Sequence, residues 1–528
     1  MLRSKAFLSS SPKPFSRKTF NVASERLLRM PLLYCQRKLT TAVVSRDAHL
    51  AACRAGFRHI RIEDRVQVNV TKQLAAFTSS LTVDKVPEPL RKECRLFVLD
   101  ALSVMVGAAL FARDNGDEIL SNYLKVAAPP GPATVVGYGI DTTPMMAAFG
   151  NGTLSEVLDC QDTNLWVRSH NGTPVIPVAL ALSQWQRIPW GELVPAIIAG
   201  YEIHTRLLLG IQPSHWYNGF QGTGTFGTSG AAATAGRLLR LNVEQTSAAL
   251  GASGFIMPVS NGDNQFKGHN IKPVHGGQAA MSGLSSALLA QAGYRAGPLE
   301  GEAPRYHAAL QILSTERDLN KCVRGLGSKW HTLEVAFKPF PIGHLIIGAV
   351  EASLVLRKEA IDPKNVKSIR VTTFRDAVTF TGKKYTSVDS NHVDAHLSIP
   401  YSVAVALIDG QLTIDQLSSR RLKDPFVHEL AGKVVCEVDE DMTRAFPTKW
   451  PVEVAINMVD GAVRKHRIDD VMWSPQRLPT WEELCNKFHV MGDRLLGADA
   501  VDQAIGILEN IDDSSDLQPL MKLVRGPA

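Results

Sequence analysis

Hydrophobic and polar positions follow two different spacings along this chain. Up to about residue 320, apolar residues recur at intervals of three and four, and residues 87–111 (PEPLRKECRLFVLDALSVMVGAALF) are the clearest example. This spacing predicts helices, and the density of apolar positions predicts that the helix at 87–111 is buried on most of its surface. Further helices are predicted at 117–127, 147–158, 173–186 and 192–209, and a short strand at 133–137.

The spacing changes beyond residue 325. Residues 368–374 (SIRVTTF) and 452–459 (VEVAINMV) alternate apolar and polar positions, as strands do when one face is buried. Helical spacing returns between them, at 400–408 and 425–435. The predicted fold class is therefore mainly α: a large all-helical domain over residues 68–335, a smaller α+β domain over 336–475, and C-terminal helices over 476–528 that return to the helical domain.

Polar residues interrupt the core pattern between residues 154 and 184. Two acids, Asp159 and Asp162, are followed by Thr163 and by the turn that contains His170. A helix is predicted to start near Thr173, because prolines follow at once and proline is tolerated in a first helical turn. Backbone amides and the helix dipole at such a start favour an anion, and a substrate carboxylate fits there. The alternative is an acidic loop followed by a capped helix.

A second polar stretch holds Lys267, His269, Lys272 and His275 within nine residues, just before a helix of small residues. Cationic groups ahead of a helix start are suited to hold an anion. Glycines around them permit a close approach of the backbone to a ligand. The alternative is a solvated basic loop.

Two further motifs carry little weight. Gly222, Gly224 and Gly227 spell GxGxxG, but no buried strand precedes them, so close helix packing is favoured over a nicotinamide-dependent dehydrogenase. The pair His392 and His396 resembles a metal-ligand spacing, yet no third ligand is evident and a surface loop is favoured. No metal site is predicted.

Charge is concentrated at the N-terminus. Residues 1–46 hold ten Lys or Arg against one acid, a surplus larger than the net charge of the whole chain, +6. An Arg- and Ser-rich, acid-poor segment is typical of a mitochondrial transit peptide, and a basic tail is the alternative. The remainder is slightly acidic, which argues against nucleic-acid binding. Seven scattered cysteines form no disulfide framework, and the apolar window 193–211 contains charged residues, so no membrane span is predicted.

Several stretches together resemble the MmgE/PrpD family of 2-methylcitrate dehydratases, cis-aconitate decarboxylases and alkylcitrate dehydratases. They include LFVLDALSVMVGAA, the block from Asp159 to His170, GTFGTSGAAATAGRLL, KPVHGGQAAMSG and GLGSKWHT, and the similarity covers residues 68–524. The resemblance implies a large helical domain, a smaller α+β lid, a cofactor-free site between them that takes a small tricarboxylic acid, and a homodimer.

By position, Asp159, Thr163, His170 and Lys272 match the family's active-site pattern, and His275 and Lys338 match it less directly. This sequence departs from the family in three places. Gln161 replaces the first acid of a usual Asp pair, Gln221 replaces a frequent histidine, and the lid segment after Lys338 lacks the common Cys and His. His344, in the segment IGHLII, is the candidate to replace the missing lid histidine, and a loss of activity is the alternative.

Dehydration of a citrate-like acid needs a base, cations for the carboxylates and a proton donor for the leaving hydroxyl. On this hypothesis His170 moves protons, Asp159 orients it and Thr163 hydrogen-bonds the substrate. The remaining candidates are expected to bind the substrate carboxylates. They are Lys272, His275, Lys338, Lys267 and His344.

The apolar segment 342–347 suits an alkyl tail, although its residues are also consistent with lid core. The sequence therefore favours an alkylcitrate dehydratase, a hydro-lyase that acts on 2-methylcitrate or a longer homologue. A cis-aconitate decarboxylase would use much the same groups and is the first alternative; a non-catalytic relative that binds tricarboxylates is the second. The expected location is the mitochondrial matrix if the leader is a transit peptide, and the cytoplasm otherwise. Primary and secondary metabolism both remain open.

Overall fold

The computed structural model describes most of the chain beyond the predicted leader, and residues Val68–Ala528 group into one compact unit. Because the unit is continuous, the domain boundaries at 335 and 475 stay predictions. The leader at 1–46 and Lys267 lie outside the described residues. Those residues are 69–266, 268–302, 307–359, 361–385 and 391–527.

Long apolar helices form the core of the first part of the chain, as the three- and four-residue spacing predicts. Helix α3 (Glu88–Asn115) is the longest and ends at Gly116, whose φ of 66° suits a helix C-cap. It has the length and hydropathy of a membrane span, but 89% of its most apolar window is buried inside the protein. Packed around it or nearby are α5 (Pro144–Val157), α6 (Gly172–Gln186), α7 (Trp190–Leu209), α9 (Gly227–Leu238) and α12 (Val274–Gln291).

Glycines at the start of α12 let it lie directly against α5. A Cβ on Gly277 would come within 2.2 Å of Thr153 Oγ1 and 2.3 Å of the Phe149 carbonyl oxygen, and one on Gly276 would clash with the Gly152 carbonyl oxygen at 2.8 Å. No larger residue fits without a backbone shift. This contact carries the loop before α12 to the C-terminal end of α5.

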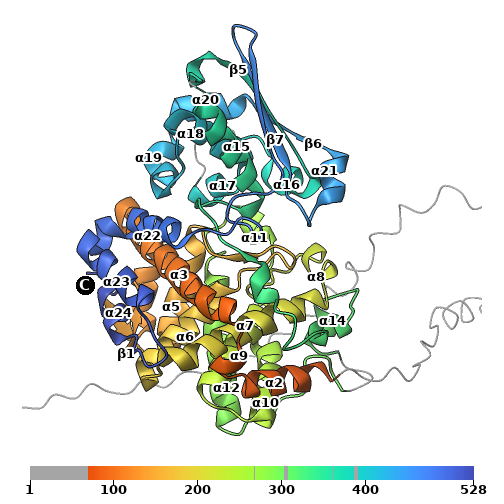
Figure 1. The fold of residues 1–528 in the computed structure, drawn as a ribbon, viewed down its shortest axis with the longest axis vertical. Helices are drawn as coiled ribbons and strands as arrows, with labels where there is room; N and C mark the ends of the chain where they lie inside the picture. The colour runs from red at the N-terminus through yellow and green to blue at the C-terminus, as the bar shows by residue number, and fades with distance from the viewer. Residues whose placement is uncertain (1–68, 267, 303–306, 360, 386–390, 528) are drawn as a thin grey trace, which may run out of the picture. The chain divides into compact units, whose positions relative to one another are not determined.

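The region from residue 336 to 475, called here the sheet region, holds a four-stranded sheet in the order β6-β5-β7-β8. Strands β5 and β6 are parallel and the other neighbours are antiparallel. Helices α15 (Ile347–Arg357), α18 (Ile399–Asp409) and α20 (Pro425–Gly432) pack beside the sheet (Figure 1). The strands are β5 (Val366–Thr373), β6 (Val434–Val438), β7 (Val452–Met458) and β8 (Val463–Ile468).

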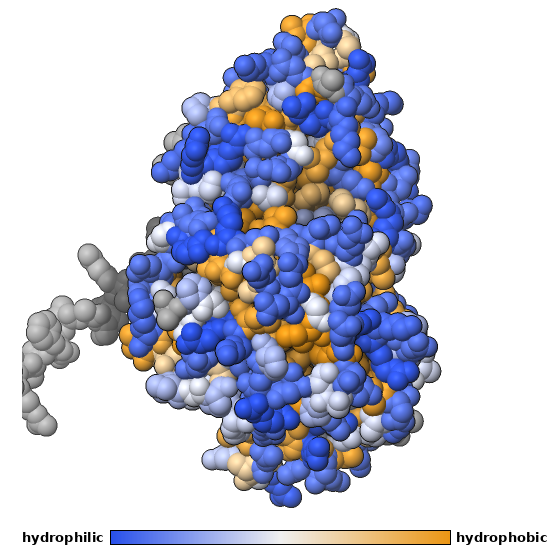
Figure 2. Space-filling view, turned by 60° about the vertical axis from the view of Figure 1, so that its left-hand side comes forward, coloured by the Kyte–Doolittle hydropathy of each residue, from blue (hydrophilic) through white to orange (hydrophobic). Residues whose placement is uncertain are grey.

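The expected strands at 368–374 and 452–459 are confirmed as β5 and β7, but β6 and β8 were not predicted. The sequence VRKHRI of β8 is exposed on five of its six residues at least in part, so it has no apolar alternation. Strand β6 begins inside the helix expected at 425–435, because α20 already ends at Gly432. Hydrophilic side chains cover most of the face drawn in Figure 2, with apolar ones showing between them.

A short strand pair and a helix–helix contact bring segments that are distant in the sequence close together. The two-residue strand β3 (Thr163–Asn164) pairs with β4 (Val335–Ala336), which sets the segment of Lys338 beside Thr163. Helix α22 (Trp481–Leu496) packs along α3, so the C-terminal segment does return to the helical part. Helix α6 starts at Gly172, close to the predicted start, although Pro177 lies inside it and not in its first turn.

Candidate active site

A cleft with about 620 Å³ of empty space, open mouth included, lies between the loop after α5 and the sheet region. Asp159, Thr163 and His170 line it from the helical side, and Lys338 and His344 line it from the sheet region. Five of the sequence-predicted site residues therefore meet at one cleft. Other residues along its wall are Arg168, Trp216, Gln265, Gly343, Leu345, Asp376, Phe380, Thr381, Leu397 and Trp450.

Two lysines and two carboxylates form a buried cluster at the base of this cleft. The Lys272 ammonium contacts the carboxylate of Glu156, on the last turn of α5, and lies 3.2 Å from Asp159 Oδ1. Lys338 Nζ lies 3.3 Å from the same Asp159 oxygen and donates a hydrogen bond of 2.6 Å to the Asp159 backbone carbonyl. Asp159 holds a φ of 48°, a left-handed conformation in which its side chain and its carbonyl both reach lysines.

Burial and the two ammonium groups compete in setting the protonation of this cluster. Burial alone would raise the pKa of Asp159, but Lys272 and Lys338 outweigh it and hold that pKa well below its ordinary value. The pKa of Glu156 is lowered in the same way, against the effect of burial, chiefly by Lys272. Burial would lower the pKa of Lys272, and the carboxylates of Asp159 and Glu156 raise it instead. Burial lowers the pKa of Lys338, and Asp159 offsets only part of that effect, so Lys272 and the two carboxylates are the most firmly ionised members of the cluster.

His170 is oriented by the loop that carries it. Its Nδ1 lies 2.8 Å from the Asp162 backbone carbonyl oxygen, which only accepts hydrogen bonds, so the neutral ring carries its proton on Nδ1. Thr163 Oγ1, 3.0 Å from the same nitrogen, accepts as well. The lone pair is then on Nε2, which lies 3.8 Å from Asp159 Oδ1. Burial lowers the pKa of His170 to about 4, so the ring is neutral near pH 7.

The start of helix α6 is already occupied by a protein carboxylate. Gly172 N–H donates to Asp162 Oδ1 at 2.9 Å, and Tyr201 O–H donates to Asp162 Oδ2 at 2.6 Å. The expectation that a substrate carboxylate binds at this helix start is therefore wrong: Asp162 caps it. Burial raises the pKa of Asp162 to about 7, and the two hydrogen bonds offset only part of that effect.

The basic loop before α12 does not act as one cradle. Lys272 and His275 turn inward, and His275 Nε2 lies 3.3 Å from Glu156 Oε2 while its Nδ1 lies 2.6 Å from Ser260 Oγ. His269 is exposed and bonds Asn264. Lys272 pairs with an anion, but this anion is the protein's own Glu156 carboxylate and not a ligand. Lys267 lies outside the described residues, so its assignment stays a prediction.

Two histidines from the sheet region lie at the cleft or close to it. His344 is 7% exposed, packs edge-on against Trp450, and has no hydrogen-bond partner at either ring nitrogen among the described residues. A buried imidazole in that state has capacity for a ligand. His396 is buried and lies in the short helix α17 (His392–His396), not in a surface loop. Its backbone carbonyl accepts a hydrogen bond from Gly343 N–H at 2.8 Å. Burial lowers the pKa of His396 to about 3 although Asp159 opposes that shift.

Sequence reasoning missed two residues that shape the cluster. Glu156 gave little signal, because it lies in the last turn of a helix of apolar and small residues and has no motif of its own. Lys487, on α22, donates to the backbone carbonyls of Cys160 (3.0 Å) and Lys338 (2.9 Å) and pairs with buried Asp100 at 2.7 Å. Lys487 thus ties together the two segments that carry Asp159 and Lys338.

Glu156, Asp159 and His170 offer ligand atoms within 4.8 Å of one another, a spacing that a metal ion also accepts. The Lys272 ammonium, however, contacts both carboxylates of this set. A divalent cation would have to displace it against the attraction that raises the pKa of Lys272. The donor set fits a lysine better than a metal.

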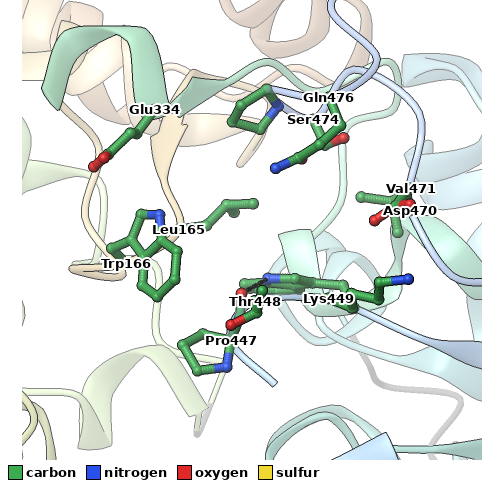
Figure 3. A pocket seen from close by; sticks show the side chains of 12 residues that line it. Leu165, Trp166, Glu334, Pro447, Thr448, Lys449, Asp470, Val471, Ser474 and Gln476 are labelled. Atoms are coloured by element: carbon green, nitrogen blue, oxygen red, sulfur yellow. Dashed lines mark hydrogen bonds between the residues drawn. The ribbon is translucent and has the colours of Figure 1, made fainter. Parts of the chain in front are cut away.

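A second, smaller pocket shares Trp450 with the cleft. Figure 3 shows Trp166 and Glu334 on one side of it and Asp470 and Val471 on the other. None of the sequence-predicted site residues that the structure describes lines it. The ionic cluster therefore singles out the cleft, and not this pocket, as the candidate active site.

The helical part and the sheet region match the two halves of one enzyme family. Residues 72–319 match the MmgE/PrpD N-terminal domain and residues 340–513 match the MmgE/PrpD C-terminal domain. The chain therefore belongs to the MmgE/PrpD family. The resemblance stated from the motifs is confirmed, and so is the mainly α fold with a smaller α+β part.

Its relatives within the family are lyases of small tricarboxylic acids by name. The chain is 26% identical over 478 residues to the cis-aconitate decarboxylase of Mus musculus. The matched segment covers 87% of this chain and 94% of that protein. It is 24% identical over 492 residues to the cis-aconitate decarboxylase of Aspergillus terreus. The matched segment covers 88% of this chain and 98% of that protein. A probable 2-methylcitrate dehydratase of Saccharomyces cerevisiae is 24% identical over 421 residues. The matched segment covers 72% of this chain and 75% of that protein.

Proposed function

We propose that this protein is a carboxy-lyase that decarboxylates cis-aconitate. The observation that carries the proposal is the similarity to cis-aconitate decarboxylases over almost their whole length, in a chain that keeps a buried lysine and carboxylate cluster beside a neutral histidine. The sequence placed alkylcitrate dehydration first and decarboxylation second. The relatives support the second candidate better.

The proposed reaction consumes one proton. The bond between the methylene carbon and its carboxylate breaks and releases CO₂, and the electron pair of that bond forms a new carbon–carbon double bond. The electrons of the original double bond move to the far carbon, which takes up a proton. The product is a five-carbon unsaturated dicarboxylate. The protein must therefore bind carboxylates, stabilise charge on the far carbon and deliver one proton.

The cleft residues divide these tasks. Lys338 and Lys272 place positive charge beside the substrate carboxylates, and Glu156 and Asp159 hold Lys272 in its charged form. Leu345, Phe380 and Trp450 exclude water from part of the wall, which favours loss of a localised carboxylate charge. Thr163, whose oxygen accepts from His170, has its own hydroxyl proton to donate to a ligand.

His170 is the proposed proton donor. Its Nε2 takes up a proton when the anionic substrate binds, because nearby negative charge raises the pKa that burial has lowered. Nδ1 is fixed by the Asp162 carbonyl, so the transferable proton is the one on Nε2. The imidazolium then protonates the far carbon as CO₂ leaves, and the ring returns to the neutral state of the free enzyme.

Dehydration of an alkylcitrate is the second candidate, supported by the similarity to the yeast protein. The apolar lid segment gives it less support than the sequence suggested. Ile342, Ile346 and Ile347 are fully buried in the core, and only Leu345 of that apolar set lines the cleft. An alkyl tail would therefore contact Leu345 and Phe380 and not an isoleucine-lined channel.

Mass spectrometry of purified protein separates the candidates. The protein is treated with a chelator and incubated with cis-aconitate, 2-methylcitrate and a long-chain alkylcitrate in separate reactions. Loss of 44 mass units from cis-aconitate supports the proposal, and activity that survives the chelator supports a site without a metal. Loss of 18 from a citrate contradicts it in favour of dehydration. Binding without conversion of any acid would favour the non-catalytic alternative.

The homodimer and the mitochondrial location stay predictions. Light scattering of the purified protein at micromolar concentration tests the first, with a mass near twice 57.6 kDa expected. Microscopy of a fusion protein that carries residues 1–46 ahead of a fluorescent reporter tests the second.

A further inference from the structure

Arg168 lines the mouth of the cleft but has no role in the chemistry described so far. It lies two residues before His170, in a loop closed by the bridge between Asn164 and Ser169. Its φ of 52° is left-handed, a conformation that is uncommon and unfavourable for a residue with a long side chain. The fold accepts this strain at a position where the side chain reaches the cleft.

The guanidinium of Arg168 is held in place by aromatic rings. Its central carbon lies 5.4 Å from the ring centroid of Trp216, 5.6 Å from that of Tyr217 and 5.1 Å from that of Phe446. Such contacts attract a cation and restrict its side-chain rotamers. Arg168 is therefore oriented before any ligand arrives, which lowers the entropic cost of using it as a binding group.

Arg168 has one ionic partner among the described residues, Asp376. Arg168 Nη2 lies 2.8 Å from Asp376 Oδ2, on helix α16 (Arg375–Thr381) of the sheet region, and both side chains keep a little under a fifth of their surface exposed. Asp376 also lines the cleft. A guanidinium presents five donors in a planar fork, so this single contact leaves capacity for a second carboxylate.

The other cations of the cleft are already matched by protein carboxylates. Lys272 contacts Glu156 and Asp159, and Lys338 contacts Asp159. An acid with three negative charges needs further positive charge, and among the described residues that line the cleft Arg168 can supply it by loosening its ionic contact with Asp376. We infer that Arg168 binds one carboxylate of the tricarboxylate substrate and that Asp376 competes with the substrate for it. This inference rests on the proposed function, because it names a specificity residue of the same site.

Substitution of each partner separates this exchange from a merely structural salt bridge. Arg168→Met should weaken binding of propane-1,2,3-tricarboxylate, an unreactive analogue, about tenfold or more in calorimetry, and Arg168→Lys should restore part of the loss. Asp376→Asn should tighten binding several-fold, because the competitor is neutralised. In the Arg168→Met background, Asp376→Asn should have little effect. For cis-aconitate, KM should follow the same order while kcat changes less than about threefold.

A structural salt bridge predicts other signs. In that case Asp376→Asn and Arg168→Met would both weaken binding and lower the melting temperature together, and this result would overturn the inference. An unchanged affinity in Arg168→Met would overturn it too. The matched control is Asp409→Asn, which breaks the similarly exposed pair with Arg421 inside the sheet region and should leave the affinity unchanged.

The two proposals fail in different ways. A wild-type protein that binds the tricarboxylate through Arg168 but leaves cis-aconitate intact contradicts the decarboxylase and supports the Arg168 assignment. Normal turnover with an unchanged KM in Arg168→Met contradicts the assignment alone. A wild-type protein that does not bind the tricarboxylate overturns both.

Discussion

Two buried ionic clusters in this protein look alike in composition and differ in what surrounds them. In the helical part, Arg206 and Glu202 on α7 form a fully buried pair at 2.8 Å. Arg206 also donates to the backbone carbonyls of Arg324, Gly325 and Lys329, and Glu202 accepts from the backbone and side chain of Thr332. This cluster is closed, because protein groups surround both charges.

The cluster of Lys272, Glu156, Asp159 and Lys338 is also buried, but two of its members, Asp159 and Lys338, line the cleft. Beside it lie a histidine with its lone pair on Nε2 and His344, whose ring nitrogens lack partners among the described residues. The comparison teaches that burial of charge does not mark a site. Unused hydrogen-bonding capacity next to a cavity does, since a structural cluster satisfies its own groups.

The largest effect is expected from removal of the proposed proton donor in the open cluster. His170→Ala should lower kcat for cis-aconitate by about 10²–10⁴-fold, the usual contribution of a positioned acid or base. The melting temperature should change little. Steady-state kinetics and a thermal scan measure both, with His428→Asn, which loses a hydrogen bond to the Leu422 carbonyl outside the cleft, as the control. Wild-type turnover by His170→Ala would refute the assignment.

Disruption of the closed cluster should lower the stability of the protein and leave its kinetics nearly unchanged. Arg206→Met leaves the Glu202 carboxylate buried without its partner and removes donors from three backbone carbonyls, so the free energy of unfolding should fall by about 3–5 kcal/mol. In the fraction that remains folded, kcat and KM should stay close to wild type. Urea denaturation combined with kinetics at low temperature tests this. A selective loss of kcat at unchanged stability would break the comparison.

Lys487 is an intermediate case, because it belongs to a closed pair and yet contacts the segments that carry the open cluster. Lys487→Met should shift the carbonyls of Cys160 and Lys338 and so displace Asp159 and Lys338, with up to about a 100-fold loss of kcat. It should also lower stability, because Asp100 loses its buried cation. If stability alone falls, Lys487 does not position the site.

A pH dependence of about tenfold per unit is expected as well. The donor form of His170 is scarce above its pKa of about 4 in the free enzyme, so kcat/KM should fall as pH rises between 5.5 and 7.5. Bound substrate raises this pKa, so the fall in kcat should begin at a higher pH than the fall in kcat/KM. Rates corrected for ionisation of the substrate measure both profiles. A flat kcat/KM would point to a lysine as the donor.

Much of the fold was predictable because local spacing determined it. The helix at α6 and the strands β5 and β7 follow from apolar positions within ten or fifteen residues. Strand β8 was not predictable, since its neighbours and not its own side chains hold it in the sheet.

The candidate site was predictable where residues share a loop and unpredictable where they come from far apart. Asp159, Thr163 and His170 lie within twelve residues and were identified together. Glu156 required knowledge that α12 lies against α5, which depends on the fit of Gly276 and Gly277. Lys487 required the return of the chain after more than three hundred residues. Which of His269 and Lys272 turns inward depends on packing that no local pattern contains.

Turnover of cis-aconitate in D₂O, followed by NMR, tests whether His170 delivers the proton to the substrate. Delivery of the proton by His170 from one side of the cleft predicts CO₂ release and one deuterium on a single face of the new methylene carbon. In His170→Ala both should be lost. Deuterium on both faces at a normal rate, which would mean protonation by bulk water, or failure of the wild-type protein to release CO₂, would contradict the account.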